Sequence, residues 1–166
     1  MAAVHDEPRL IETTAQDARA TTLFALQEAE LLRRYGGEDT GERPPSDAPA
    51  LLLSVGDEPA GCVALSIHGR VAEIKRMFVA ESARGRGLSR LLLAGVENLA
   101  RRDGVEVLRL VTGTEQPEAM ALYSSSGYAS IPGFGYWSDE PDARFFAKRL
   151  RPVPAVDPHP ASSAER

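Results

Sequence analysis

Residues 72–93 read AEIKRMFVAESARGRGLSRLLL, in which a strand-like run enters a glycine-rich turn that opens an apolar helix. Backbone N–H groups at such a turn, together with the positive end of the helix dipole, bind anions. Gly85 and Gly87 have no side chain that would keep a phosphate from the backbone. The stretch therefore predicts a site for a pyrophosphate group, formed by Arg84, Gly85, Arg86, Gly87, Leu88, Ser89 and Arg90, whose arginines add mobile positive charge.

This stretch resembles the acetyl-CoA-binding segment of the GNAT family of N-acetyltransferases, whose signature Gln/Arg-x-x-Gly-x-Gly/Ala follows a strand. It is present here as Arg84-x-x-Gly87-x-Ser89, with serine at the sixth position in place of glycine or alanine. A second block follows in the family's order, Ala119-x-x-Leu122-Tyr123 and then Gly127-Tyr128. The resemblance covers roughly residues 50–150. It implies acetyl-CoA as cosubstrate and N-acetyl transfer as the activity.

Hydrophobic periodicity predicts elements in the order β-α-β-β-β-α-β-α-β-β, which the resembled family also shows. The expected helices are Ala18–Tyr35, Leu88–Arg102 and Pro117–Ser126. The expected strands are Leu10–Thr13, Ala50–Val55, Gly61–His68, Val71–Val79, Val105–Val111, Tyr128–Ile131 and Arg144–Leu150. The expected fold is of the α/β (α+β) class, a mixed and mostly antiparallel sheet flanked by helices.

Length and composition favour one globular domain. The chain has 166 residues, of which 43% are hydrophobic, and this suits a single core over residues 9–150. Residues 1–8 are expected to be flexible. Residues 151–166 are rich in proline and are expected to form a disordered tail. The long polar segment 38–49 is expected to be a functional or mobile loop.

Charge and targeting signals exclude several classes of function. A net charge of −5 disfavours general nucleic-acid binding. No run approaches the roughly 18–20 apolar residues of a membrane helix, so no membrane partner is expected. The N-terminus lacks the layout of a signal peptide, and the lone Cys62 cannot form an internal disulfide. The three histidines show no metal spacing. A cytoplasmic protein without a metal is the simplest interpretation.

Two residues are candidates for the chemistry of amide formation from a thioester, which needs an amine freed of its proton and a proton for the departing thiolate. Glu73 lies four residues before Met77, where one subgroup of the resembled family has its general base, usually acting through water. The alternative is that Glu73 pairs with Lys75 on the same face of the strand. Tyr123 occupies the place of the family's general acid, and the alternative is a tyrosine that packs the helix onto the sheet.

Other residues are candidates for holding the two substrates. Backbone groups of Met77, Phe78 and Val79 would pair with the pantetheine amides if neighbouring strands splay. Gln116 stands where the family often has an Asn that contacts the cofactor. Lys75 and Arg76 interrupt an apolar strand, and one of them is expected to bind a carboxylate of a small acidic or amino-acid-like acceptor.

The remaining alternatives concern the acceptor and the assembly. An aromatic cluster is expected either to line the acceptor site or, for Trp137 in particular, to serve the core or a dimer contact; it comprises Phe134, Tyr136, Trp137, Phe145 and Phe146. The sequence leaves a homodimer open. A small-molecule amine is the preferred acceptor. A protein or peptide N-acetyltransferase and a non-catalytic CoA-sensing module are the alternatives.

Overall fold

The computed structural model describes residues 7–152. The strands are β1 (Pro8–Thr14), β2 (Pro49–Val55), β3 (Glu58–His68), β4 (Val71–Val79), β5 (Val107–Gly113), β6 (Ala129–Ser130) and β7 (Ala143–Arg149). The helices are α1 (Ala18–Tyr35), α2 (Leu88–Arg102) and α3 (Pro117–Ser125), with a short 3-10 helix, η1 (Glu81–Ala83), before the glycine-rich turn. Residues 1–6 and 153–166 of the two expected tails lie outside the described residues, whereas Pro8 already belongs to β1.

The strands form one sheet in the order β1-β2-β3-β4-β5-β7-β6. Neighbouring strands are antiparallel except β4 and β5, which are parallel. The predicted fold class and element order are thus confirmed. The short helix η1 was not predicted.

Several strand boundaries differ from the sequence expectation, and hydrogen bonding explains two of the differences. Strand β3 begins at Glu58, because Glu58 already pairs with Val55 across a tight turn. Strand β5 runs from Val107 rather than Val105. The carbonyl of Arg70 accepts from the N–H groups of Glu106 and Val107, so the chain enters the sheet only there. The apolar Val105 is buried as part of the connection.

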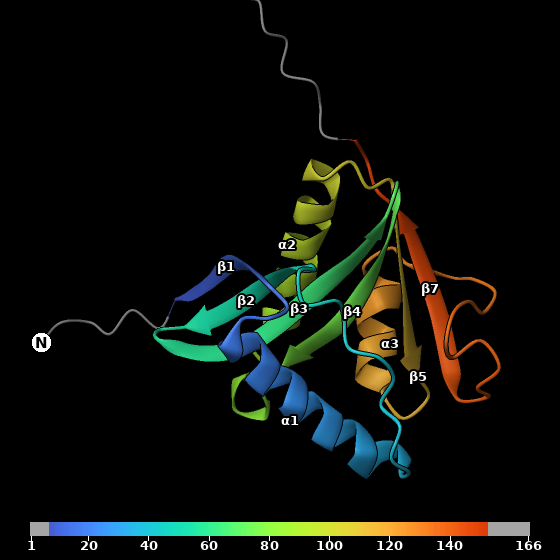
Figure 1. Cartoon of the computed structure of the whole chain (residues 1–166), viewed down its shortest axis with the longest axis horizontal. Coiled ribbons are helices and arrows are strands. Elements are labelled where there is room, and N and C mark those ends of the chain that lie inside the picture. The colour runs from blue at the N-terminus through green and yellow to red at the C-terminus, as the bar shows by residue number, and fades with distance from the viewer. Residues whose placement is uncertain (1–6, 153–166) are drawn as a thin grey trace, which may run out of the picture.

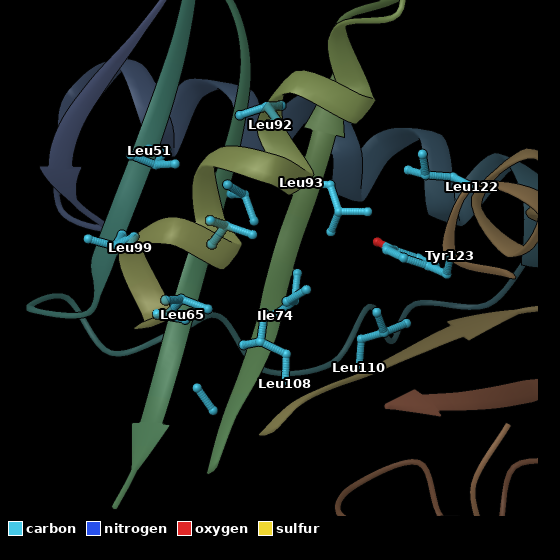
Figure 2. Packing of buried hydrophobic residues seen from close by; sticks show 14 of the residues in the cluster. Leu51, Leu65, Ile74, Leu92, Leu93, Leu99, Leu108, Leu110, Leu122 and Tyr123 are labelled. Atoms are coloured by element: carbon cyan, nitrogen blue, oxygen red, sulfur yellow. The ribbon is translucent and has the colours of Figure 1, made fainter. Parts of the chain in front are cut away.

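Helices cover both faces of the sheet (Figure 1). Helices α2 and α3 pack on the face that carries Leu65, Ile74, Leu108 and Leu110 (Figure 2). Helix α1 packs on the opposite face, against a smaller cluster that includes Leu52, Cys62 and Phe78. Full burial of each such side chain stabilises the fold by about 1.5–3 kcal/mol. Within residues 7–152, no helix has the length and hydropathy to cross a membrane.

Candidate active site

Strands β4 and β5 pair at only three positions and then diverge. The last pair is Glu73 with Arg109, although β4 continues to Val79 and β5 to Gly113. Figure 1 shows the two strands separating toward their C-terminal ends, with α3 beyond the gap. A cavity of about 330 Å³ lies at this divergence. The predicted site residues that line it are Arg76, Met77, Phe78, Val79, Arg84, Gly85, Gly87, Leu88, Ser89, Gln116 and Tyr123.

A β-bulge in β4 shapes the wall of the cavity. Cys62 pairs with Phe78 and Ala64 pairs with Lys75. The single residue between them in β3, Val63, therefore lies opposite two residues of β4, Arg76 and Met77. Arg76 has a φ of 53°, which is uncommon for a residue with a side chain and costs of order 1–3 kcal/mol. The bulge also reverses the alternation of side chains. Ile74 packs with α2, whereas Phe78 packs with α1.

The glycine-rich turn has the backbone conformation that an anion-binding site requires. Gly85 and Gly87 have φ values of 77° and 74°, in the left-handed region that favours glycine. Gly87 caps the N-terminus of α2, and open space surrounds the position of a Cβ at both glycines. No acidic residue lies in the first turn of α2. The turn therefore fits a pyrophosphate group, which would meet free N–H groups and the helix dipole.

The three arginines of the turn occupy different environments. Arg84 forms two hydrogen bonds to Glu30 of α1, at 2.8 and 3.0 Å, and these raise the pKa of its guanidinium. Arg90 donates to the hydroxyls of Ser125 and Ser126 and does not line the cavity. Arg86 is exposed and lines a separate hollow beside Val55 and Ala60. Arg84 thus reaches the cavity already bound to a carboxylate.

Two backbone carbonyls of β4 at the divergence accept hydrogen bonds from side chains. Gln27 Nε2 donates to the carbonyl of Met77 at 3.0 Å, and Arg84 Nε donates to that of Val79 at 3.0 Å. Gln116 lies just before α3, where its Oε1 accepts from the hydroxyl of Tyr35 at 3.1 Å. The cavity edge is therefore polar on both sides.

Tyr123 is buried at the inner end of the cavity, with 6% of its surface exposed. Its ring packs edge-on against Tyr128, and its hydroxyl has a weak contact to Met77 Sδ at 4.0 Å. Figure 2 shows this hydroxyl directed toward Leu93 of α2. Burial raises the pKa of the Tyr123 phenol. The hydroxyl therefore keeps its proton and is available as a donor.

Glu73 and Lys75 lie on the α1 face of the sheet, outside the lining of the cavity. Their β3 partners are Ser66 and Ala64, and Ala64 belongs to the core under α1. Lys75 Nζ lies 3.2 Å from Glu73 Oε1, so the ion pair considered from the sequence is present. Tyr123 packs on the opposite face. The two candidate catalytic side chains thus flank the divergence from opposite sides.

Two loops meet over the α1 face. Tyr136 in the β6–β7 loop donates a 2.6 Å hydrogen bond to Asp39 in the α1–β2 loop. The Trp137 ring lies against Gly41, where its Nε1 would be 2.9 Å from an added Cβ. Trp137 therefore makes a contact within the chain. Phe134 of the same loop packs under Arg109, whose guanidinium carbon is 4.0 Å from the ring centroid.

Sequence reasoning did not identify several polar residues around the cavity. Gln27, Glu30 and Thr112 line it, and Thr112 Oγ1 is buried without a hydrogen-bond partner among residues 7–152. The sequence pattern could have indicated that Gln27 is buried, because it follows Leu23 and Phe24 at helical spacing on the buried face of α1. No local sequence pattern indicates that Glu30 or Thr112 lines the cavity.

The mixed sheet with diverging central strands is the acyl-CoA N-acyltransferase fold, as comparison with known proteins shows. The sequence model of the Acetyltransferase (GNAT) family matches residues 11–128. The chain therefore belongs to this family.

Three relatives illustrate the similarity. An IAA acetyltransferase from Azospirillum brasilense is 39% identical over 90 residues, which span 54% of this chain and only 59% of that protein. A Klebsiella pneumoniae protein assigned to the acyl-CoA N-acyltransferases is 29% identical, with a TM-score of 0.77 over 88% of this chain and 99% of that one. A GNAT acetyltransferase from Elizabethkingia anophelis with acetyl-CoA bound is 20% identical, with a TM-score of 0.67, covering 87% and 99% of the two chains. At 20% identity, the similarity to the Elizabethkingia anophelis structure shows the fold alone.

Proposed function

We propose that this chain is an acetyl-CoA-dependent N-acetyltransferase that acetylates a primary amine of a small molecule by direct attack. The observation that carries the proposal is the cavity between β4 and β5, which connects the glycine-rich turn to Tyr123. Acetyl-CoA would supply the acetyl group as a thioester. The N–H groups at Gly87–Ser89 would hold its pyrophosphate, and the edge of β4 beyond Glu73, where no strand pairs with it, would hold its pantetheine arm.

Glu73 and Tyr123 would move the protons. The reaction forms a C–N bond, breaks a C–S bond and releases one proton from the amine. Glu73 would accept this proton through a water molecule, because it lies on the α1 face but outside the cavity lining. Tyr123 would donate its proton to the sulfur from the other face. Proton return from Glu73 to Tyr123 through solvent then restores both groups.

Cys62 supports direct attack over a covalent enzyme intermediate. It is fully buried under α1, and its thiol donates to the Arg76 carbonyl at 3.5 Å. Burial raises the pKa of Cys62 to about 12, so the thiolate that a nucleophilic mechanism needs is scarce at neutral pH.

Contacts between the α1–β2 loop and the β6–β7 loop favour a small molecule rather than a polypeptide as the acceptor. The contacts of Tyr136 with Asp39 and of Trp137 with Gly41 join the α1–β2 loop to the β6–β7 loop. A peptide substrate would need these contacts to open into a groove.

The test is a matrix of initial rates at varied acetyl-CoA and amine concentrations, with CoA release as the readout. Small amines and lysine-containing peptides are compared. We expect turnover with small amines and intersecting double-reciprocal lines, as a ternary complex requires. Parallel lines would indicate a covalent intermediate, and faster turnover of peptides would favour the polypeptide acceptor. CoA binding without turnover of any amine would make the chain a CoA-sensing module.

A further inference from the structure

Two buried side chains end in polar atoms without partners on the α1 side of the cavity. Gln27 is 8% exposed, and the Arg76 side chain is 5% exposed. Within residues 7–152, Gln27 Oε1 and Arg76 Nη1 have no hydrogen-bond partner. Both residues line the cavity. Because a buried polar atom without a partner is unfavourable, these two atoms point to a ligand.

Neighbouring groups fix which atom of each side chain remains free. Gln27 Nε2 donates to the Met77 carbonyl, and the reverse orientation of the amide would set two oxygens against each other. Arg76 Nη2 donates to the carbonyls of Thr40 and Gly41, at 3.2 and 3.1 Å. The free acceptor of Gln27 and the free donor of Arg76 are therefore held in place before any ligand binds.

The charge around Arg76 is not balanced by its neighbours. Arg76 Nη2 lies 3.3 Å from Glu28 Oε2, but Arg43 forms two hydrogen bonds to the same carboxylate, at 2.6 and 3.0 Å. Two guanidinium groups thus share one carboxylate and leave one positive charge over. Burial lowers the pKa of Arg76, which shows that its charge is poorly solvated. Lys75, in contrast, has its own partner in Glu73.

We propose that the acceptor carries a carboxylate beside its primary amine, that Arg76 Nη1 binds this carboxylate, and that Gln27 Oε1 accepts a hydrogen bond from the amine. The assignment rests on the proposed N-acetyltransferase function. A hydrogen bond from the amine to Gln27 uses an N–H group and leaves the nitrogen lone pair for attack. Of the two cations in the middle of β4, Arg76 rather than Lys75 is thus the anchor.

The experiment compares probes that differ by one carboxylate. L-leucine, L-phenylalanine and 4-aminobutyrate are each paired with the amine that lacks the carboxylate, namely 3-methylbutylamine, 2-phenylethylamine and propylamine. Calorimetry on the CoA-saturated protein gives the Kd of each probe, and CoA release from acetyl-CoA gives turnover. For at least one pair, we expect the carboxylate-bearing probe to bind about tenfold tighter or more, because charge-assisted hydrogen bonds are the strong ones.

The variant Arg76→Gln should remove this preference, and calorimetry with CoA checks that the variant still forms the cavity. Glu28 keeps Arg43 in this variant, so no carboxylate is left unpaired. The control Arg102→Gln removes the same charge from α2 on the opposite face, where Arg102 pairs with Glu12, and should keep the preference. The wild-type comparison needs no substitution, so it tests the proposal even if Arg76→Gln does not fold.

Two results would overturn the proposal. One is wild-type protein that binds no carboxylate-bearing probe, or none better than its matched amine. The other is a folded Arg76→Gln protein that retains the preference. Acetylation of amines without a carboxylate preference would refute this inference and leave the proposed function intact. Carboxylate-dependent binding with no acetylation of any probe would support the anion site and refute the proposed function.

Discussion

A buried phenol is well suited to give a proton to a thiolate. Tyr123 is 6% exposed and burial raises its pKa, so the hydroxyl is protonated across the working pH range. Its contact to the Met77 sulfur at 4.0 Å is weak, so the proton is not committed to a strong acceptor among the described residues. The ring packs against Tyr128 and Phe146, which fixes the direction of the hydroxyl.

We predict that Tyr123→Phe lowers turnover and leaves CoA affinity unchanged. The ring and its packing remain, while the thiolate loses a positioned proton donor. The fall in kcat should be about tenfold to a few hundredfold, in the lower part of the range for general acids. Calorimetry with CoA and steady-state kinetics measure the two quantities. Equal activity of the variant and the wild type, with chemistry shown to limit the rate, would reduce Tyr123 to a packing residue.

For Glu73 we predict that Glu73→Gln lowers kcat on the order of 10²–10⁴-fold, as the loss of a general base does. Lys75→Met is the matched variant, because it breaks the same 3.2 Å ion pair and keeps the carboxylate. If both variants lose activity equally, the ion pair with Lys75 rather than a general base at Glu73 is what matters.

At the scale of elements, local signals predicted the helices and strands where those signals are strong. Helix α1 spans Ala18–Tyr35 as expected, because Asp17 caps its first turn and Gly36 ends it with a φ of 71°. Strand β4 and helix α2 also have their expected bounds. The start of β5 was wrong by two residues. The carbonyl of Arg70, far away in sequence, decides where that strand begins.

The bulge in β4 and the partners of the site arginines could not be predicted from local patterns. Alternation correctly placed Glu73 and Lys75 on one face, but it cannot show that Arg76 adopts a left-handed backbone. The Arg76 side chain meets Glu28 and the carbonyls of Thr40 and Gly41, all of which are distant in the sequence. The partner of Arg84, Glu30, is likewise distant, 54 residues earlier in the chain. The sequence thus predicted residues of the glycine-rich turn and Tyr123, which line the cavity, whereas the partners of Arg76 and Arg84 needed the tertiary structure.

For the glycine-rich turn we predict that Gly87→Asp abolishes CoA binding. The substitution places a side chain and a negative charge where the pyrophosphate would meet the N-terminus of α2. Calorimetry with CoA measures the effect. The control is Gly69→Asp in the turn before β4, which also has a positive φ, 63°, and open space around its Cβ. It should carry a similar backbone strain and keep CoA affinity. Unchanged affinity in a folded Gly87→Asp protein would refute the pyrophosphate site.

At the scale of the whole molecule, α1 is joined to four other parts by ion pairs. Glu28 binds Arg43 of the α1–β2 loop and Arg76 of β4. Glu30 binds Arg84 of the glycine-rich turn, and Arg34 pairs with Glu118 of α3. Hydrogen bonds from Arg43 and Arg84 hold the pKa values of Glu28 and Glu30 below their usual range. The ion pairs that join α1 to Arg43, Arg76 and Arg84 therefore depend on these two carboxylates staying ionised.

We predict that acid weakens the protein through these pairs. A glutamate whose pKa is lower in the folded state stabilises the fold fully above its unfolded pKa of about 4.3, and this contribution is lost as pH falls through the folded value. The Tm should therefore change little between about pH 7 and pH 5.5 and should fall below about pH 4. Circular dichroism melts across this range measure the Tm.

The double variant Glu28→Gln/Glu30→Gln should have a lower Tm at neutral pH, but its Tm should fall less on acidification. Glu58→Gln, which removes an exposed carboxylate without an ion pair among residues 7–152, should follow the wild type. An equal acid loss in the double variant and the wild type would place the pH sensitivity in other carboxylates.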